Sequence, residues 1–361
     1  MSTTAEAVSF VIPVHNGEQY LESVLQSVFA QADGRTMEVL VVEDGSADGS
    51  PEILSRYAAA GAIRVIQGPR RGATAALNEG IRHAQHPVIC QVDQDVILQP
   101  GWMACLTDAL RDRSIGAAQG YYVTPPNGGA WSRVMGLDLE NRYRAIGDRD
   151  VDHVCTGNTA YRADALRDVG LFDEDLGYGY DNDLSYRLVS FGYRLVIRPE
   201  ARSIHRWREG WRNFLVQQYG FGYGRLDLVA KHRGSRVRGD DVSGLWMMLH
   251  APLMALVVAS LATAGVLAIS GVSPAVPLIF AATITGVLAV ERCAAGVRAA
   301  ITYKDAAGLL FAPVHLVRDL AWVAAISVWS FRRLRGAGSR PGDSMRPRPA
   351  PSRVTATRPV R

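Results

Sequence analysis

The sequence predicts an α/β domain built on a mostly parallel β-sheet, followed by helices hydrophobic enough to enter a membrane. Up to about Leu245, short runs rich in Val and Ile alternate with segments whose apolar residues recur at helical spacing. Strands that alternate with helices of about 10 to 15 residues are typical of βαβ units. From Leu245 to about Ser330, Ala, Leu, Val and Ile dominate. A chain of 361 residues is long enough for about two or three units.

The α/β pattern can be followed element by element. Residues 8–14 and 38–42 read as short buried strands, and residues 17–30 between them carry apolar side chains at helical spacing. Ser50, followed by Pro51, is the expected N-cap of the next helix. Two more strands, at 63–66 and 88–92, enclose a helix at 74–84. Ligands of such sheets bind beyond the carboxyl ends of the strands, which is where the polar motifs lie.

The hydrophobic region predicts a helical hairpin. Residues 245–270 are long enough to span a bilayer, which needs about 20 apolar residues, and residues 272–290 suffice. Ser270 to Pro274 provide a tight connection between them. The segment after the second helix is expected to be a cytoplasmic loop, because it carries three basic residues, Arg292, Arg298 and Lys304.

A third hydrophobic segment, residues 308–330, is interrupted by polar residues. Each charge at the centre of a bilayer would cost about 2.5–3.5 kcal/mol, and the segment contains His315, Arg318 and Asp319. We therefore expect an interfacial or re-entrant helix in preference to a third span. With this arrangement, the N-terminal domain, the loop and the C-terminal tail are all cytoplasmic.

Charge and cysteine content narrow the function classes further. The net charge is only +4, but residues 332–361 contain nine arginines against the single Asp343. Such a tail could bind nucleic acid; beside hydrophobic helices, binding to anionic lipid is the simpler reading. Four scattered cysteines with no CxxC pair indicate neither a disulfide framework nor a zinc site. The first apolar run, residues 8–14, is short and follows no basic region, so no signal peptide is expected.

Two strand-end motifs can bind a nucleotide. Residues 13–17 (PVHNG) and 41–50 (VVEDGSADGS) bring Asn16, Glu43 and Asp44 near one another if their strands are neighbours. A carboxylate at a strand end suits the N–H group of a nucleobase or a ribose hydroxyl. An ordinary βα turn with a solvated Asp-Gly pair is the alternative.

The QVDQDV motif, residues 91–96, predicts a metal site. Asp93 and Asp95 stand at i and i+2, so on an extended backbone their carboxylates point to the same side. Two neighbouring carboxylates repel each other unless a divalent cation lies between them. Such a cation, bridging Asp95 to a diphosphate, would stabilise a leaving group. A solvated Asp-x-Asp turn is the alternative.

Taken in order along the chain, these motifs resemble those of family 2 glycosyltransferases of the GT-A fold, over roughly residues 8–210. The resemblance implies that Asp44 binds the nucleobase, that Asp95 holds Mg²⁺ or Mn²⁺ under the diphosphate, and that Asp93 lies beside the ribose or the metal. It extends the nucleotide-sugar site to Pro13, His15, Asn16, Glu43 and Asn78. Leu77 stands where many relatives have Arg, so a diphosphate contact is lost or moved to Arg70 or Arg71.

The segment LFDEDLGYGYDNDLSYRL, residues 171–188, can supply a general base. Direct displacement at a sugar carbon needs a group that takes the proton of the acceptor hydroxyl, and the resemblance gives this role to Asp181. Tyr180 departs from the family pattern, which has Glu there. The resemblance also places Asp183 at the acceptor site. The alternative is that Asp181 is an N-cap and Asp183 a partner of the helix dipole.

The remaining motifs resemble the acceptor side of the same family. In CTGNTAYR, residues 155–162, Gly157 and Asn158 are expected near the sugar. His205 matches a family histidine that approaches the metal or the diphosphate, with a purely structural histidine as the alternative. Trp207 is expected to bind the acceptor, within an aromatic and basic segment, 205–225, that suits a membrane interface or a surface helix. The Gln-x-x-Arg-Trp motif of processive synthases is absent, which favours addition of one sugar.

The sequence therefore predicts four regions: a GT-A catalytic domain (1–230), a linker (231–244), membrane-associated helices (245–331) and a basic disordered tail (332–361). The predicted activity is an inverting transfer from a nucleotide-diphosphate sugar to a hydroxyl of a membrane-associated, lipid-linked or saccharide acceptor, with Mg²⁺ or Mn²⁺. No nucleic-acid partner is expected. Two alternatives stay open: a polyprenyl-phosphate sugar synthase, and an inactive membrane scaffold that keeps the fold.

Overall fold

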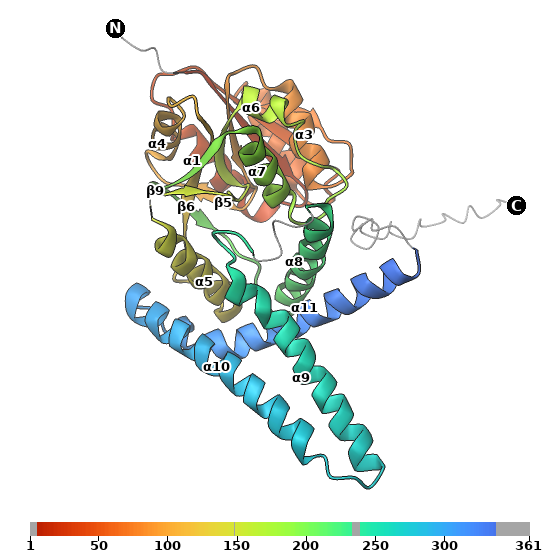
Figure 1. Ribbon diagram of the computed structural model, residues 1–361. Helices are drawn as coiled ribbons and strands as arrows, with labels where there is room; N and C mark the ends of the chain where they lie inside the picture. Colours follow the sequence, from red (N-terminus) through yellow and green to blue (C-terminus); the bar gives the residue numbers. More distant parts are fainter. Residues whose placement is uncertain (1–5, 148, 233–238, 337–361) are drawn as a thin grey trace, which may run out of the picture.

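The computed structural model describes residues 6–147, 149–232 and 239–336. Figure 1 shows an N-terminal α/β unit resting on long helices, two of which project away from it as a hairpin. The α/β unit contains one mixed sheet in the order β3-β2-β1-β4-β8-β6-β9-β5, with β7 paired to β9. This confirms the predicted fold class.

The first half of the sheet is parallel. Its strands are β1 (Val8–Val14), β2 (Met37–Glu43), β3 (Arg64–Gln67) and β4 (Val88–Val92), and β1 pairs with both β2 and β4. The connecting helices are α1 (Glu18–Phe29), α2 (Ser50–Ala59) and α3 (Ala73–His83). Because these strands run in one direction, their carboxyl ends meet at the same edge of the sheet.

The second half of the sheet reverses direction. β8 (Asn158–Arg162) lies antiparallel to β4 and to β6 (Ile115–Val123), and β9 (Arg194–His205) lies parallel to β6. The short strands β5 (Val96–Leu98) and β7 (Asp150–Val151) both pair with β9. The helices of this half are α4 (Trp102–Ala109), α5 (Ala130–Ile146), α6 (Ala163–Asp168) and α7 (Tyr180–Phe191).

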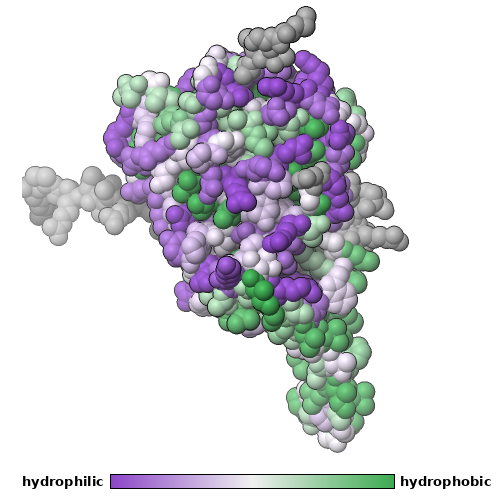
Figure 2. Space-filling view, turned by 90° about the vertical axis from the view of Figure 1, so that its left-hand side faces the viewer, coloured by the Kyte–Doolittle hydropathy of each residue, from purple (hydrophilic) through white to green (hydrophobic). Residues whose placement is uncertain are grey.

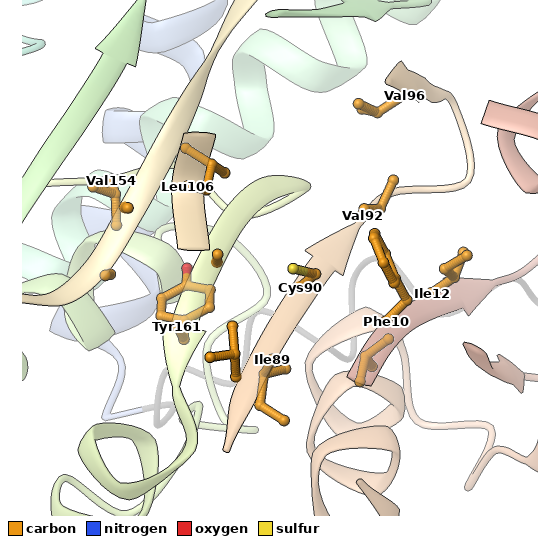
Figure 3. Packing of buried hydrophobic residues seen from close by; sticks show 14 of the residues in the cluster. Phe10, Ile12, Ile89, Cys90, Val92, Val96, Leu106, Val154 and Tyr161 are labelled. Carbon is orange, nitrogen blue, oxygen red and sulfur yellow. The ribbon is translucent and has the colours of Figure 1, made fainter. Parts of the chain in front are cut away.

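The core of the α/β unit lies on both faces of the sheet. Figure 3 shows Phe10 and Ile12 of β1 beside Cys90 and Val92 of β4, and all four side chains are fully buried. Strands covered on both faces need continuous apolar runs, which explains why β1 and β4 contain so few polar residues. The polar residues begin where these strands end.

Two local predictions were wrong. Gly49, not Ser50, is the N-cap of α2; Ser50 is the first residue of the helix, and its hydroxyl accepts a hydrogen bond from the Gly17 N–H at 2.9 Å. The cytoplasmic loop expected after residue 290 is helical, because α10 (Ala275–Tyr303) continues through Arg292 and Arg298. In both cases the residue makes a tertiary contact that the local sequence pattern does not indicate. Ser50 connects two loops through its hydrogen bond to Gly17, and an Arg292 nitrogen lies 3.5 Å from a carboxylate oxygen of Asp138 in α5.

The C-terminal helices are α8 (Trp211–Lys231), α9 (Leu245–Ile269), α10, the 3₁₀ helix η1 (Ala306–Leu310) and α11 (Phe311–Leu334). Three segments are long and apolar enough to cross a membrane, namely α9, α10 and η1 with α11. In Figure 2 the projecting hairpin of α9 and α10 is largely hydrophobic at its surface, whereas the α/β unit is largely hydrophilic. This distribution is typical of a membrane-associated protein.

The polar residues of α11 are buried inside the protein. His315, Arg318 and Asp319 are each at most 5% exposed. Arg318 Nε donates to Asp319 at 2.9 Å, and His250 of α9 lies 3.1 Å from the same carboxylate. Figure 1 shows α11 running crosswise beneath the α/β unit, unlike the projecting hairpin. The free-energy cost of placing these charged residues of α11 in a bilayer is therefore lower than expected for lipid-exposed charges, because protein groups surround them.

Candidate active site

A cavity of about 530 Å³ lies between the α/β unit and the C-terminal helices. The loop between β4 and β5 contributes Asp93 and Asp95 to its wall, and the start of α7 contributes Asp181. His205 and Trp207, at and after the end of β9, complete this polar end. The structure thus brings together five of the predicted site residues, which come from three distant parts of the sequence.

The loops after β1 and β2 are held together by side-chain hydrogen bonds. Asn16 Oδ1 accepts from the Ala47 N–H at 2.8 Å, and the Asn16 N–H donates to Ser46 Oγ at 3.0 Å. Asn16 has a φ of 55°, a conformation that Asn tolerates better than most residues. Glu43 Oε1 accepts from the Gly45 N–H at 3.0 Å. Burial opposes ionisation of Glu43, but backbone N–H groups of this turn lower its pKa.

His15 connects this pair of loops to the Asp-x-Asp turn. The His15 N–H donates to Gln94 Oε1 at 2.8 Å, and Gln94 Nε2 donates to the His15 carbonyl at 3.0 Å. Pro13, one residue before the end of β1, pairs with Val42 of β2. The carboxyl ends of β1, β2 and β4 therefore form one continuous edge.

Asp44 follows β2 at this edge, and β1 separates β2 from β4, whose end contributes Asp93 to the cavity. Its Oδ1 accepts from the Arg70 N–H at 2.6 Å, and its Oδ2 accepts from the Gly72 N–H at 3.0 Å. The carboxylate itself is not part of the cavity wall, whereas the adjacent Ala73 is. The arrangement gives Asp44 a clear role in holding the loop of residues 68–72 against the end of β2.

Asp93, Asp95 and His205 form a cluster suited to a divalent cation. His205 Nε2 lies 3.4 Å from Asp95 Oδ1, and His205 Nδ1 is buried without a hydrogen-bond partner among the described residues. Burial, with the charge of Asp95 next in importance, raises the pKa of Asp93 to about 6. Two carboxylates in conflict beside an imidazole nitrogen are a donor set that Mg²⁺ or Mn²⁺ fits.

Gly157 makes room for this cluster. Its φ is +88°, and a Cβ at this position would lie 2.4 Å from Asp93 Oδ2. The Asp93 N–H also donates to the Gly157 carbonyl at 3.2 Å. A glycine is therefore required twice, for its backbone conformation and for the space that the carboxylate occupies.

Asp181 faces the cavity from the first turn of α7. Its Oδ1 accepts from the Asn182 N–H at 2.9 Å, and its Oδ2 lies 3.7 Å from His153 Nε2. Burial alone would lower the pKa of His153, but neighbouring Cys155 and Asp181 raise it well above its usual value. No role was predicted from the sequence for His153 or Cys155. Cys155 is the first residue of the CTGNTAYR motif and His153 lies two positions before it, which was the available signal.

Three aromatic rings close the side of the cavity near β9. The ring centroids of Trp207 and His205 are 3.9 Å apart, and that of Tyr122 lies 5.1 Å from His205 and 5.9 Å from Trp207. An aromatic face beside polar groups is a surface on which a sugar ring can stack.

Three other predicted site residues are buried away from the cavity wall. Asn78 is hydrogen-bonded to the backbone of Phe172, and Asn158 Oδ1 accepts from the indole N–H of the core residue Trp102. Asp183 is fully buried in ion pairs with the basic residues Arg187, Lys231 and His232. In this conformation the three side chains contact other parts of the protein, and none of them lines the cavity.

Solved structures define the class of this fold. The chain aligns over 92% of its length with the mannosyltransferase PcManGT from Pyrobaculum calidifontis, solved in complex with GDP-Man and Mn²⁺; the TM-score is 0.60 at 19% identity, and 89% of that chain is covered. This chain therefore has the GT-A fold.

Sequence comparisons then give the family. Residues 9–170 match the family described as Glycosyl transferase family 2. The succinoglycan biosynthesis protein ExoA of Rhizobium meliloti is 26% identical over 91% of this chain and 97% of its own length. A pre-mycofactocin glycosyltransferase of Mycobacterium tuberculosis is 29% identical over 62% of this chain; the match spans only about half of that relative, 48%. The N-terminal part of the chain, residues 9–170, is thus similar to the family 2 glycosyltransferases.

Proposed function

We propose that this protein transfers one sugar from a nucleotide-diphosphate sugar to a hydroxyl of a membrane-associated acceptor, with inversion at the anomeric carbon. The observation that carries the proposal is the convergence of Asp93, Asp95 and Asp181 on one cavity. Two of these carboxylates suit the donor's diphosphate and its cation, and the third suits the acceptor hydroxyl. The complex of PcManGT with GDP-Man and Mn²⁺ supports a donor and a metal of this kind.

The donor would lie along the edge formed by β1, β2 and β4. Asn16, Glu43 and Asp44 shape the nucleoside end of that edge through the hydrogen bonds described above. Asp95, Asp93 and His205 would hold Mg²⁺ or Mn²⁺. A bound divalent cation supplies positive charge that stabilises the diphosphate as it leaves.

Asp181 would act as the general base. In one displacement its carboxylate takes the proton of the acceptor hydroxyl, the oxygen forms a bond to the anomeric carbon, and the bond from that carbon to the diphosphate breaks. The nucleoside diphosphate leaves from the opposite face, so the configuration inverts.

The acceptor side of the cavity supports a substrate held at the membrane. Away from the carboxylates, the C-terminal helices contribute both polar and apolar residues to the cavity lining; the apolar ones include Phe221 of α8, Met247 of α9 and Trp322 of α11. Of these helices, α9 also forms part of the hydrophobic hairpin of Figure 2. An amphiphilic acceptor could place its sugar at Asp181 and its lipid along these helices. In this proposal the α/β unit lies on the cytoplasmic side of the membrane.

The Asp181→Asn variant of the full-length protein tests this mechanism. We expect the turnover number, measured as nucleotide release with a lipid-linked saccharide acceptor, to fall by about 10²–10⁴-fold. Donor binding, measured by calorimetry with Mn²⁺, should be unchanged. The matched control is Asp175→Asn, because Asp175 is exposed in the loop that precedes α7; it should retain full turnover.

Other outcomes would select the alternatives. Near-normal turnover of Asp181→Asn would favour a phosphate acceptor, which needs no base. If no nucleotide-diphosphate sugar binds in a metal-dependent manner, the protein is a scaffold and the proposal fails. If soluble sugars are better acceptors than lipid-linked ones, the membrane-associated acceptor is wrong while the transferase activity stands.

A further inference from the structure

Three potential metal ligands meet on the cavity wall beside the proposed base, apart from the Asp95 cluster. His153 Nε2 lies 3.7 Å from Asp181 Oδ2 and 3.9 Å from Cys155 Sγ. One ligand atom from each of the three residues lies within 4.8 Å of the other two. The proposed transfer reaction uses only the carboxylate, so it gives no reason for a thiol at this position.

The chemistry of the three ligands differs from that of the Asp95 cluster. A thiolate, an imidazole nitrogen and a carboxylate oxygen form a set typical of Zn²⁺, whereas the Asp95 cluster has two carboxylates and no sulfur, which suits Mn²⁺ or Mg²⁺ better. Typical zinc bond lengths at tetrahedral angles separate neighbouring ligand atoms by about 3.4–3.6 Å. The observed separations from His153 Nε2 exceed these by only a few tenths of an ångström, which side-chain rotations can close.

The surroundings favour a cation bound through sulfur. Tyr143 Oη lies 2.9 Å from Cys155 Sγ, where its hydroxyl can donate to a thiolate. His153 is only 5% exposed; its Nε2 contacts Cys155 and Asp181, whereas its Nδ1 has no hydrogen-bond partner among the described residues. All three ligands line the cavity, which leaves a fourth position open to solvent.

We propose that His153, Cys155 and Asp181 form a binding site for a thiophilic divalent cation of the Zn²⁺ type, and that its occupancy inhibits sugar transfer. A carboxylate bound to a metal is a weaker base, because the cation stabilises its ionised form, so it accepts the proton of the acceptor hydroxyl poorly. Without the metal, His153 pairs with Asp181 and leaves the base available. The inhibition depends on the proposed role of Asp181 as the base, whereas the binding does not.

Cobalt binding to the full-length protein tests the site directly. Co²⁺ bound to a thiolate gives a near-ultraviolet charge-transfer band, and excess Mg²⁺ keeps the oxygen-rich Asp95 cluster occupied. We expect this band in the wild type, its loss in Cys155→Ser and its retention in Cys105→Ser, whose half-buried thiol lies on α4. In calorimetric titrations, Zn²⁺ should bind Cys155→Ser at least about tenfold more weakly than the wild type. Absence of the band from the wild type, or its persistence in Cys155→Ser, would overturn the proposal.

Two further measurements separate the site from the proposed function. Calorimetry with a nucleotide sugar checks that Cys155→Ser is folded, and His153→Asn serves as a second variant that should also weaken Zn²⁺ binding. In transfer assays at fixed Mg²⁺, Zn²⁺ should inhibit the wild type, and Cys155→Ser should need at least about tenfold more Zn²⁺ for the same inhibition. Equal sensitivity would show that inhibition arises elsewhere. Cobalt binding without any transferase activity would leave the site intact and reject the proposed function instead.

Discussion

Asn78 forms a two-way hydrogen bond with the backbone of Phe172: its Nδ2 donates to the Phe172 carbonyl at 2.9 Å, and its Oδ1 accepts from the Phe172 N–H at 3.0 Å. The two residues are 94 positions apart. This pair ties α3 of the parallel half of the sheet to the loop that leads into α7 and Asp181. Asn78 thus stabilises the loop that leads to Asp181 without lining the cavity itself.

The Asn78→Ala variant should therefore lose stability. Both backbone groups of Phe172 would be left buried without a partner, which costs about 1–3 kcal/mol for each unsatisfied group. The midpoint of thermal unfolding should fall clearly below that of Asn213→Ala, in which only an exposed hydrogen bond is lost. Equal midpoints would contradict the supporting role and return Asn78 to the donor site, where the sequence analysis placed it.

The Asp95→Asn variant should weaken metal-dependent binding of the nucleotide sugar by at least about tenfold, because a carboxylate ligand is replaced by a neutral amide. Calorimetry with and without Mn²⁺ measures the effect. Asp108→Asn is the matched control, because the Asp108 side chain is 71% exposed on α4. If both variants bind the donor equally well with Mn²⁺, the cation is held elsewhere.

Gly157→Ala should separate backbone strain from damage to the metal cluster. A left-handed conformation costs a non-glycine residue about 1–2 kcal/mol, and the new Cβ would also collide with Asp93 Oδ2. Gly170 has a similar φ of +83°, but a Cβ added there would meet nothing within 4 Å. Gly157→Ala should lose more stability than Gly170→Ala, because the collision adds to the backbone strain, and only Gly157→Ala should lose Mn²⁺-dependent binding of the donor. Loss in both variants would point to general unfolding.

The pH dependence of stability should report on Asp138, which joins α5 to the C-terminal helices. Burial opposes its ionisation, but Arg142 at 3.2 Å and other basic groups, including Arg292, hold its pKa well below the usual value. A carboxyl group with a lowered folded-state pKa stabilises the protein above its unfolded pKa, near 3.8, and this contribution is lost as the pH falls further.

Asp138→Asn should consequently be less stable at pH 7, by about 3–5 kcal/mol, since breaking a buried ion pair leaves charges without a partner. Its stability should also vary less than that of the wild type below about pH 4. Thermal unfolding at several pH values, with Asp108→Asn as a control, measures both effects. If the stability of Asp138→Asn falls as steeply with decreasing pH as that of the wild type, Asp138 is not the titrating group.

These cases show which parts of the site could be predicted from the sequence. The strand-end motifs predicted that Asn16, Glu43 and Asp93 lie at one edge of the sheet, and the structure has them there, because parallel strands bring their carboxyl ends together. His153 could not be predicted in the same way. Its contact with Asp181 depends on β8 lying antiparallel between β4 and β6, and such non-local pairing leaves no local periodicity in the sequence.

The hydrophobic region shows the same division. The hairpin of α9 and α10 was predictable from length and composition alone. In contrast, the burial of Arg318 and Asp319 in α11 follows from packing against other helices, which composition does not report. The Asn158 and Asp183 assignments followed family motifs, but a motif gives a residue's position along the chain without fixing which face of its strand or helix meets the core.

The hairpin also allows a direct test of membrane topology. With 29 residues, α10 is roughly 43 Å long at 1.5 Å per residue, enough to cross a hydrocarbon core of about 30 Å. If the α/β unit is cytoplasmic, the turn at Val272 lies on the opposite side and Lys304 on the cytoplasmic side. In intact cells, a membrane-impermeant maleimide should label Val272→Cys but not Lys304→Cys, each in a variant in which the four native cysteines are replaced by serine. Labelling of Lys304→Cys alone would reverse the orientation, and protection of both cysteines until the cells are lysed would mean that the hairpin enters the bilayer without crossing it.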